Sequence, residues 1–200
     1  KTIRLLQLAY NIYEERNERV LILTYNRALI SNLQRLMSLM GKSKMNEDGG
    51  NIKFLSVHQF MRMLLISYGY VNKENKNFFL DNYENHIKEL AQHLKKKSLS
   101  KKEIKEEADL KLCQKFNDES LFDYVFIDEG QDWFEEEAFI LGCIFGINNL
   151  AVAHGVNQEV RGLSFDWKIL TDKDSFNQRF LRKGRRMKSN LISFIQIILD

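Results

Sequence analysis

Four short apolar runs, each bordered by a helical pattern, constrain the fold of this chain most strongly. They cover residues 20–24, 52–55, 124–127 and 150–153. Continuous apolar runs of this length are typical of strands that are buried on both faces of a sheet. Strands that alternate with helices along a chain are characteristic of parallel sheets. The sequence therefore predicts an α/β fold, with a parallel sheet flanked by helices.

Apolar residues at helical spacing predict the helices between these strands. Residues 2–16 read as an amphipathic helix. A second helix follows the first strand and carries apolar residues as far as Met40, before a polar, glycine-bearing loop over residues 41–51. Ser56 and Gln59 form an S-x-x-Q capping box, which predicts that a third helix begins directly after the second strand.

Residues 68–119 differ in composition from the rest of the chain. They contain many lysines and glutamates and few residues that favour strands, so two or three helices are predicted, inserted into the sheet domain. Lysine clusters at 95–97 and 101–102 are interpreted as a solvated helix face in preference to a nucleic-acid patch. The formal net charge of the whole chain is only +3, which gives no strong electrostatic argument for nucleic acid.

The cysteine count and the hydropathy pattern exclude several classes of protein. The two cysteines, Cys113 and Cys143, are too few for a disulfide framework and lack the spacing of a metal site, and they fit a reducing compartment. No apolar run is long enough to span a bilayer, and no secretory signal is present. The sequence therefore predicts a cytoplasmic protein without a membrane partner.

The most informative polar motif is D-E-G-Q-D at residues 128–132, directly after the apolar run 124–127. Ligands of open parallel sheets gather at the carboxyl ends of the strands. At such a position Asp128 can hold a hydrated Mg²⁺, and Glu129 can take the proton of an attacking water. An acidic turn without function, placed after a buried strand, is the alternative that these residues alone leave open.

A second feature is the pair Lys1 and Thr2, which opens the first predicted helix. In a phosphate-binding loop a lysine reaches the β- and γ-phosphates, the following hydroxyl joins Mg²⁺, and the helix N-terminus completes the anion site. The chain starts inside one helical pattern, without an initiator methionine, and stops inside another at 191–199. We therefore expect it to be a fragment with sequence missing on each side.

Taken in order, these motifs resemble superfamily 1 helicases of the UvrD/Rep type. Five segments carry the resemblance: Lys1-Thr2 as the tail of the Walker A loop, 23–29 as motif Ia, 56–60 as the T-x-H-x-F segment, 128–132 as the D-E-A-Q-D form of Walker B with glycine at the third place, and 181–191 as motif IV. A sixth segment is similar to motif III, usually G-D-x-x-Q, through Gln158. Gly155 stands where that motif has its aspartate.

The resemblance implies a RecA-like P-loop NTPase fold. Residues 1–67 and 120–170 would form the first motor domain, without its first strand and phosphate loop. Residues 68–119 would be a helical insertion in the place of an accessory subdomain, and 171–200 the start of a second RecA-like domain.

The resemblance also implies ATP and Mg²⁺ as cofactors. Lys1, Thr2, Asp128 and Gln131 would bind the nucleotide, with Thr2 and Asp128 as the metal ligands, and Glu129 would activate water. Phosphoryl transfer depends mainly on such positioning and charge neutralisation.

Two further catalytic roles follow from the resemblance alone. Gln158 would sense the γ-phosphate, and Arg186 would reach it as an arginine finger from the second domain. For Arg186 the alternative is an ordinary basic turn over 182–186, solvated or bound to any polyanion.

Nucleic-acid contacts are predicted at two strand-to-helix turns, whose hydroxyls, amides and helix N-termini suit phosphates. The candidates are Thr24, Tyr25, Asn26, Ser56 and His58. Tyr25, His58 and Phe60 also offer aromatic faces for stacked bases, although core packing is the preferred interpretation of Phe60 and a purely structural role stays open for His58. Trp133 is expected to pack against the following helix, and Trp167 is left without a role.

The resulting hypothesis is an ATP-dependent helicase or translocase that moves on single-stranded DNA, with RNA as the alternative strand. The fragment itself is expected not to hydrolyse ATP, because half of the phosphate cradle and most of the second domain are missing from it. A non-catalytic nucleic-acid or protein-binding module on a helicase-like fold is the first alternative, favoured by Gly155 in motif III and by Gly184. A P-loop ATPase that does not move on nucleic acid is the second.

Overall fold

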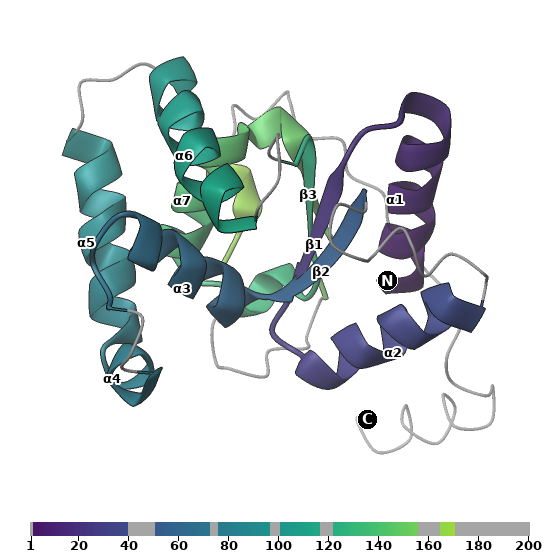
Figure 1. Ribbon diagram of the computed structural model, residues 1–200, viewed down its shortest axis with the longest axis horizontal. Coiled ribbons are helices and arrows are strands. Elements are labelled where there is room, and N and C mark those ends of the chain that lie inside the picture. The colour runs from purple at the N-terminus through teal and green to yellow at the C-terminus, as the bar shows by residue number, and fades with distance from the viewer. Residues whose placement is uncertain are drawn as a thin grey trace, which may run out of the picture.

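Four parallel strands form the central sheet of the computed structural model, which describes residues 2–39, 51–72, 76–96, 101–116, 122–155 and 165–170. The strands are β1 (Val20–Thr24), β2 (Ile52–Ser56), β3 (Tyr124–Ile127) and β4 (Leu150–Val152), and their order in the sheet is β2-β1-β3-β4. Helices cover both faces of the sheet (Figure 1). The predicted α/β fold with a parallel sheet is therefore confirmed.

The burial of each strand depends on its neighbours. β1 lies between β2 and β3, with Val20 level with both Ile52 and Tyr124, and all five of its residues are buried. β4 differs from the prediction of a fourth buried strand over 150–153, because it ends at Val152 and its residues are only half-buried. Within the described part of the chain it pairs with β3 alone, so its other edge has no strand to cover it.

Two helices cover one face of the sheet. They are α1 (Thr2–Arg16), with the bounds predicted, and α2 (Arg27–Leu39). Their apolar sides pack with strand residues in one buried cluster, which includes Leu6, Ala9, Leu33, Met37, Ile22, Phe54 and Phe126. Met40 and the predicted loop, except for Asn51, lie outside the described residues.

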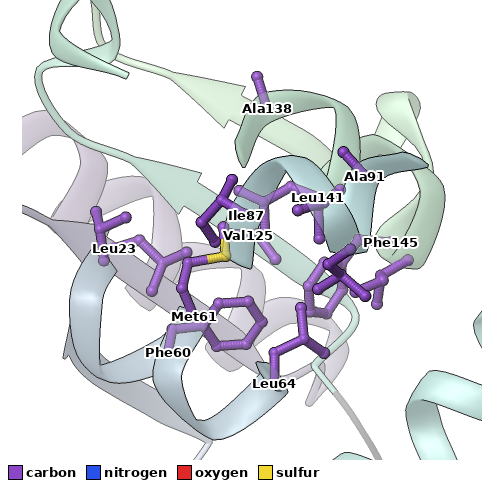
Figure 2. Close-up of a cluster of buried hydrophobic side chains, with 14 of the residues drawn as sticks. Leu23, Phe60, Met61, Leu64, Ile87, Ala91, Val125, Ala138, Leu141 and Phe145 are labelled. Carbon is purple, nitrogen blue, oxygen red and sulfur yellow. The ribbon is translucent and has the colours of Figure 1, made fainter. Parts of the chain in front are cut away.

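The opposite face carries α3 (Val57–Ser67), α5 (Tyr83–Lys96), α6 (Lys101–Phe116) and α7 (Glu135–Phe145). Figure 2 shows side chains of three of these helices meeting those of the sheet, among them Leu23, Phe60, Met61, Leu64, Ile87, Ala91, Val125, Ala138, Leu141 and Phe145. This is the larger of the two buried clusters, so the helices added after α3 share a core with the sheet.

The described residues of the predicted insertion form three helices, α4 (Lys76–Asp81), α5 and α6, in agreement with the expected two or three. Lys95, Lys96 and Lys102 are exposed, as expected for a solvated face. Short 3₁₀ helices complete the fold: η2 (Gly130–Asp132), η3 (Ile147–Asn149) and η4 (Trp167–Leu170). No helix in the described ranges is both long and apolar enough to cross a membrane.

Side-chain caps start α2 and α3 directly after their strands. The Oδ1 atom of Asn26 accepts a hydrogen bond from the Leu29 amide at 3.1 Å. The predicted capping box is confirmed, since Ser56 Oγ accepts from the Gln59 amide at 3.2 Å and Gln59 Oε1 accepts from the Ser56 amide at 3.1 Å. These caps satisfy helix N–H groups that have no partner within the helix.

Candidate functional site

Polar residues gather where the parallel strands end. Thr24 is level with Ser56 across the β1–β2 pair, and Leu23 is level with Ile127 across the β1–β3 pair. The Asp128 amide, one residue further on, donates to the Leu23 carbonyl at 2.9 Å. The structure therefore brings three of the predicted site residues, from three strands, to one edge of the sheet. The first residues of α1 lie at the same end of the molecule (Figure 1).

The 128–132 turn holds the predicted metal ligand Asp128 and the predicted base Glu129 in different ways. The Asp128 side chain is almost fully buried, whereas Glu129 is half-buried. Glu129 has φ 49° and ψ 54°, in the left-handed region that residues with a β-carbon adopt at a cost of about 1–2 kcal/mol. Its carboxylate accepts a hydrogen bond from Gln131 Nε2 at 2.9 Å, so this strained residue has a fixed side chain as well as a fixed backbone.

Gln131 connects the 128–132 turn to the end of β4. It is buried, and its Oε1 atom accepts from the Gly155 amide at 2.8 Å while its Nε2 atom donates to Glu129. A backbone bond from the Gly130 amide to the Ala153 carbonyl, at 2.9 Å, runs alongside. The side chain predicted to bind nucleotide thus bonds within the protein here, and its contact with nucleotide stays a prediction.

Gly130 stands where the resembled Walker B motif has alanine, and the structure gives a steric reason. A β-carbon at this position would lie 2.3 Å from Val152 Cγ1 and 3.0 Å from Trp167 Nε1. Contacts below 3.0 Å require a neighbour to move, and Trp167 is itself buried. The glycine therefore lets η4 lie directly against the turn.

Trp167, to which the sequence assigned no role, is part of the site. Its Nε1 atom donates to the Gly130 carbonyl at 2.8 Å, and its ring contacts that of Trp133 at 5.5 Å. Trp133 is buried in the cluster that also contains the apolar side of α7, and its own Nε1 atom donates to the Asp128 carbonyl at 3.4 Å. No local pattern marks Trp167, because its partners are distant in sequence.

Beside the turn, a buried carboxylate organises a group of aromatic residues. Glu137 is fully buried and accepts hydrogen bonds from the hydroxyls of Tyr25 and Tyr83 and, at 2.9 Å, from the Phe134 amide. The His58 ring contacts the rings of Tyr25, at 5.3 Å between centroids, and Tyr83, at 4.8 Å. Sequence reasoning missed Glu137 and Tyr83. The sequence signal that could have identified Glu137 is its position. It is the third residue of α7, where an acidic side chain can cap a helix.

A pocket of about 290 Å³ lies next to His58. It is lined by His58, Leu80, Asp81, Asn82, Tyr83, Glu84, Asn85 and Phe134. The carboxylates of Asp81 and Glu84 are exposed at this place. The Glu84 carboxylate lies 4.0 Å from the ammonium group of Lys88, and the His58 ring at the side of the pocket packs against Tyr25 and Tyr83.

The residues predicted to touch nucleic acid differ in their accessibility. Thr24 and Ser56 are 1% exposed, and their hydroxyls bond locally, to the Asn26 amide at 3.1 Å and within the α3 capping box. Asn26 is exposed, and Tyr25 and His58 are half-buried. The preferred interpretation of Phe60 is confirmed, because its ring is fully buried in the core and cannot stack on a base. Nucleic-acid contact by the other five stays a prediction.

Several predicted site residues lie outside the described part of the chain. These are Lys1, Gln158 and Arg186, together with the basic segment around Arg186. The backbone of Thr2 begins α1, but its side chain is not described.

The predicted metal ligands can be compared with the acidic residues of the turn. Within the described ranges no group of three or more His, Cys, Asp or Glu side chains lies close enough to hold a metal ion. Asp128 supplies a carboxylate oxygen, and Mg²⁺ is usually held by one or two carboxylates together with waters and phosphate oxygens. A buried carboxylate of this kind can help to hold Mg²⁺, and its use for that ion stays a prediction.

Comparison with known proteins adds no identification, since no family model, no curated protein and no solved structure matches the chain.

Proposed function

We propose that this chain is part of an ATP-dependent helicase or translocase that couples ATP hydrolysis to movement along single-stranded DNA. The observation that carries the proposal is the Asp128–Glu129 pair at the carboxyl end of β3, beside the ends of β1 and β2. In an open parallel sheet this edge is where ligands bind. The first residues of α1 lie at this same end of the molecule (Figure 1), as the resemblance to a RecA-like domain would require.

ATP bound with Mg²⁺ would supply the phosphoryl group to be transferred to water. The carboxylate of Asp128 would hold this pair together with Lys1 and Thr2. Glu129 would accept the proton of the attacking water at a carboxylate oxygen. Gln131 orients that carboxylate through its hydrogen bond of 2.9 Å.

The strand would cross the turns after β1 and β2. Asn26, Tyr25 and His58 have accessible side chains there, while Thr24 and Ser56 would contribute through the backbone of the turns. A base is the part of the strand that would face the His58 ring, because bases stack on aromatic side chains.

The experiment is a measurement of ATP hydrolysis by the longest natural polypeptide that contains this chain, with and without single-stranded DNA. We expect strong stimulation by DNA and its loss in Glu129→Gln. Glu135→Gln is the matched control, because Glu135 is exposed in the first turn of α7. Stimulation that survives Glu129→Gln would remove Glu129 as the base, and hydrolysis that ignores DNA would point to a P-loop ATPase that does not move on nucleic acid.

One observation favours the alternative of a binding module without turnover. Gly155 stands in place of the aspartate of the resembled motif III, and its amide donates a hydrogen bond to Gln131. Gln131 in turn donates a hydrogen bond to the Glu129 carboxylate. A protein of this kind would bind single-stranded DNA or ATP with unchanged affinity in Glu129→Gln and would hydrolyse nothing in either form.

A further inference from the structure

The chain contains two tryptophans, and both donate their indole N–H to the same turn. Trp133 donates to the carbonyl of Asp128, at 3.4 Å, and Trp167 to that of Gly130, at 2.8 Å. These carbonyls belong to the residues immediately before and after Glu129. The two rings also pack on each other, with centroids 5.5 Å apart and planes at 69°.

The residue between these two carbonyls is strained. Left-handed backbone at a residue such as Glu129 persists only where the surrounding contacts over-determine it. Two backbone bonds act on the peptide that follows Glu129, from the Asp132 amide to the Glu129 carbonyl at 3.0 Å and from the Gly130 amide to the Ala153 carbonyl at 2.9 Å. Neither of these two bonds involves the peptide that precedes Glu129 or the Gly130 carbonyl. The indoles donate to these two groups, at the carbonyls of Asp128 and Gly130.

We propose that Trp133 and Trp167 form an indole clamp that keeps Glu129 in its left-handed conformation and so positions its carboxylate. Trp167 is the stronger half, because its hydrogen bond is shorter and the Phe165 amide adds a second bond from the same segment, to the Gln131 carbonyl at 3.4 Å. The absence of a β-carbon at Gly130 is what allows this approach. Both tryptophans are positioning residues, and the use of Glu129 as a base rests on the proposed function.

The test replaces the N–H donor and keeps the ring. Trp167 is exchanged for β-(3-benzothienyl)alanine, in which sulfur takes the place of the indole N–H, and, in a second variant, for 5-fluorotryptophan, which retains it. Trp167→Phe is a third variant that needs no unnatural residue. Tyr124→Phe is the control, because it removes a hydroxyl at the opposite end of β3, where Arg16 donates to it at 3.3 Å.

The first readout is NMR of the 200-residue chain, in which backbone couplings and carbon shifts of Glu129 report the sign of φ. We expect a positive φ in the wild type, the fluorotryptophan variant and the control. We expect its loss in the benzothienyl and phenylalanine variants. A positive φ that survives both of these would overturn the clamp, whether or not the protein hydrolyses ATP.

The second readout is steady-state hydrolysis by the longest natural polypeptide. Without the N–H donor we expect kcat to fall at least about tenfold, since small displacements of a catalytic group cost up to about a hundredfold, while KM for ATP stays within about twofold. Fluorotryptophan should restore kcat. If the wild type shows the positive φ and does not hydrolyse ATP, the proposed function is contradicted and the indole clamp is not. If kcat is unchanged in the variants without the N–H donor, the indole clamp has no role in catalysis.

Discussion

The hydroxyl of Tyr25 donates a hydrogen bond to the fully buried carboxylate of Glu137, joining the turn after β1 to the first turn of α7. Tyr83 of α5 donates to the other oxygen of the same carboxylate. Three segments that are distant in sequence therefore meet on one acidic side chain. Because His58 contacts both tyrosine rings, this carboxylate also determines the surroundings of the residue proposed to face a base.

Replacing Glu137 by glutamine should lower the free energy of unfolding by about 1–3 kcal/mol, because an amide NH₂ would face donors that now bond to a carboxylate oxygen. Urea denaturation measures the change. Glu135→Gln is the control and should stay within about 0.5 kcal/mol, because Glu135 is exposed in the same helical turn. Equal effects of the two substitutions would show that the buried hydrogen bonds contribute nothing specific.

Gly130→Ala should destabilise the fold by about 1–3 kcal/mol, since the new β-carbon would collide with Val152 and crowd Trp167. Gly142→Ala is the matched control. Gly142 lies inside α7, where a β-carbon would make an ordinary contact of 3.5 Å with Ile147, and alanine there should be neutral or stabilising by up to about 1 kcal/mol. If Gly130→Ala is as stable as the wild type in urea, the close approach of Trp167 is wrong.

Features that depend on local pattern were predictable from the sequence. The four strands and the helices beside them follow from the spacing of apolar residues, and the start of α3 follows from Ser56 and Gln59. The position of Asp128 and Glu129 at the sheet edge follows as well, because parallel strands end together. For the strands, the helices and the capping box, the residues that determine the feature lie within a few positions of one another.

Features that depend on distant partners were not predictable. The bond from Trp167 to Gly130 joins residues 37 positions apart, and that from Tyr83 to Glu137 joins residues 54 apart. Nothing in the neighbourhood of these residues specifies such contacts. The half-burial of β4 escaped prediction for the same reason, since it depends on which strands lie beside it.

Tyr68 should make stability depend on alkaline pH. Burial, together with the charges of Glu107 and Cys143, raises the pKa of its hydroxyl well above the ordinary value of 10.0. At pH values between 10.0 and the raised pKa of the folded protein, the Tyr68 hydroxyl has lost its proton in the unfolded chain and keeps it in the folded chain. The free energy of unfolding therefore falls as pH rises above about 10. In Tyr68→Phe this contribution is absent. Urea titrations of both proteins from pH about 8 to 11 should therefore show a shallower decline for the variant, and parallel declines would contradict the assignment.

Asp128→Ala should reduce ATP hydrolysis by at least about a hundredfold and change the affinity for single-stranded DNA by less than about twofold, because this carboxylate is proposed to hold only the nucleotide-bound cation. Turnover and fluorescence anisotropy of labelled DNA provide the two measurements. Asp123→Ala is the control at the amino end of β3, where that exposed side chain accepts from the Arg19 amide at 2.8 Å. Loss of DNA binding in Asp128→Ala would mean that the cation site is misplaced.

His58→Ala should weaken binding of single-stranded DNA by about fivefold to a hundredfold, the range expected when one stacked base loses its ring. Ser56→Ala separates structure from recognition. Its hydroxyl is buried in the capping box, so we expect a loss of about 1 kcal/mol in stability and an unchanged affinity of the folded protein. An affinity that falls in Ser56→Ala and not in His58→Ala would reverse the two assignments.

The pairing of β1 with β3 also determines the order in which the chain can fold during synthesis. Arg19 and Asp123, which flank the starts of these strands and are hydrogen-bonded, lie 104 positions apart, whereas β2 follows β1 after a much shorter segment. At ribosomal rates of about 5–20 residues per second, β1 waits about 5–20 seconds for β3 to emerge. A nascent chain that stops before Tyr124 therefore presents one edge of its most buried strand unpaired. The helices α1, α2 and α3 and those of the insertion are all made before β3, so they are available to cover the sheet before the ribosome delivers this strand.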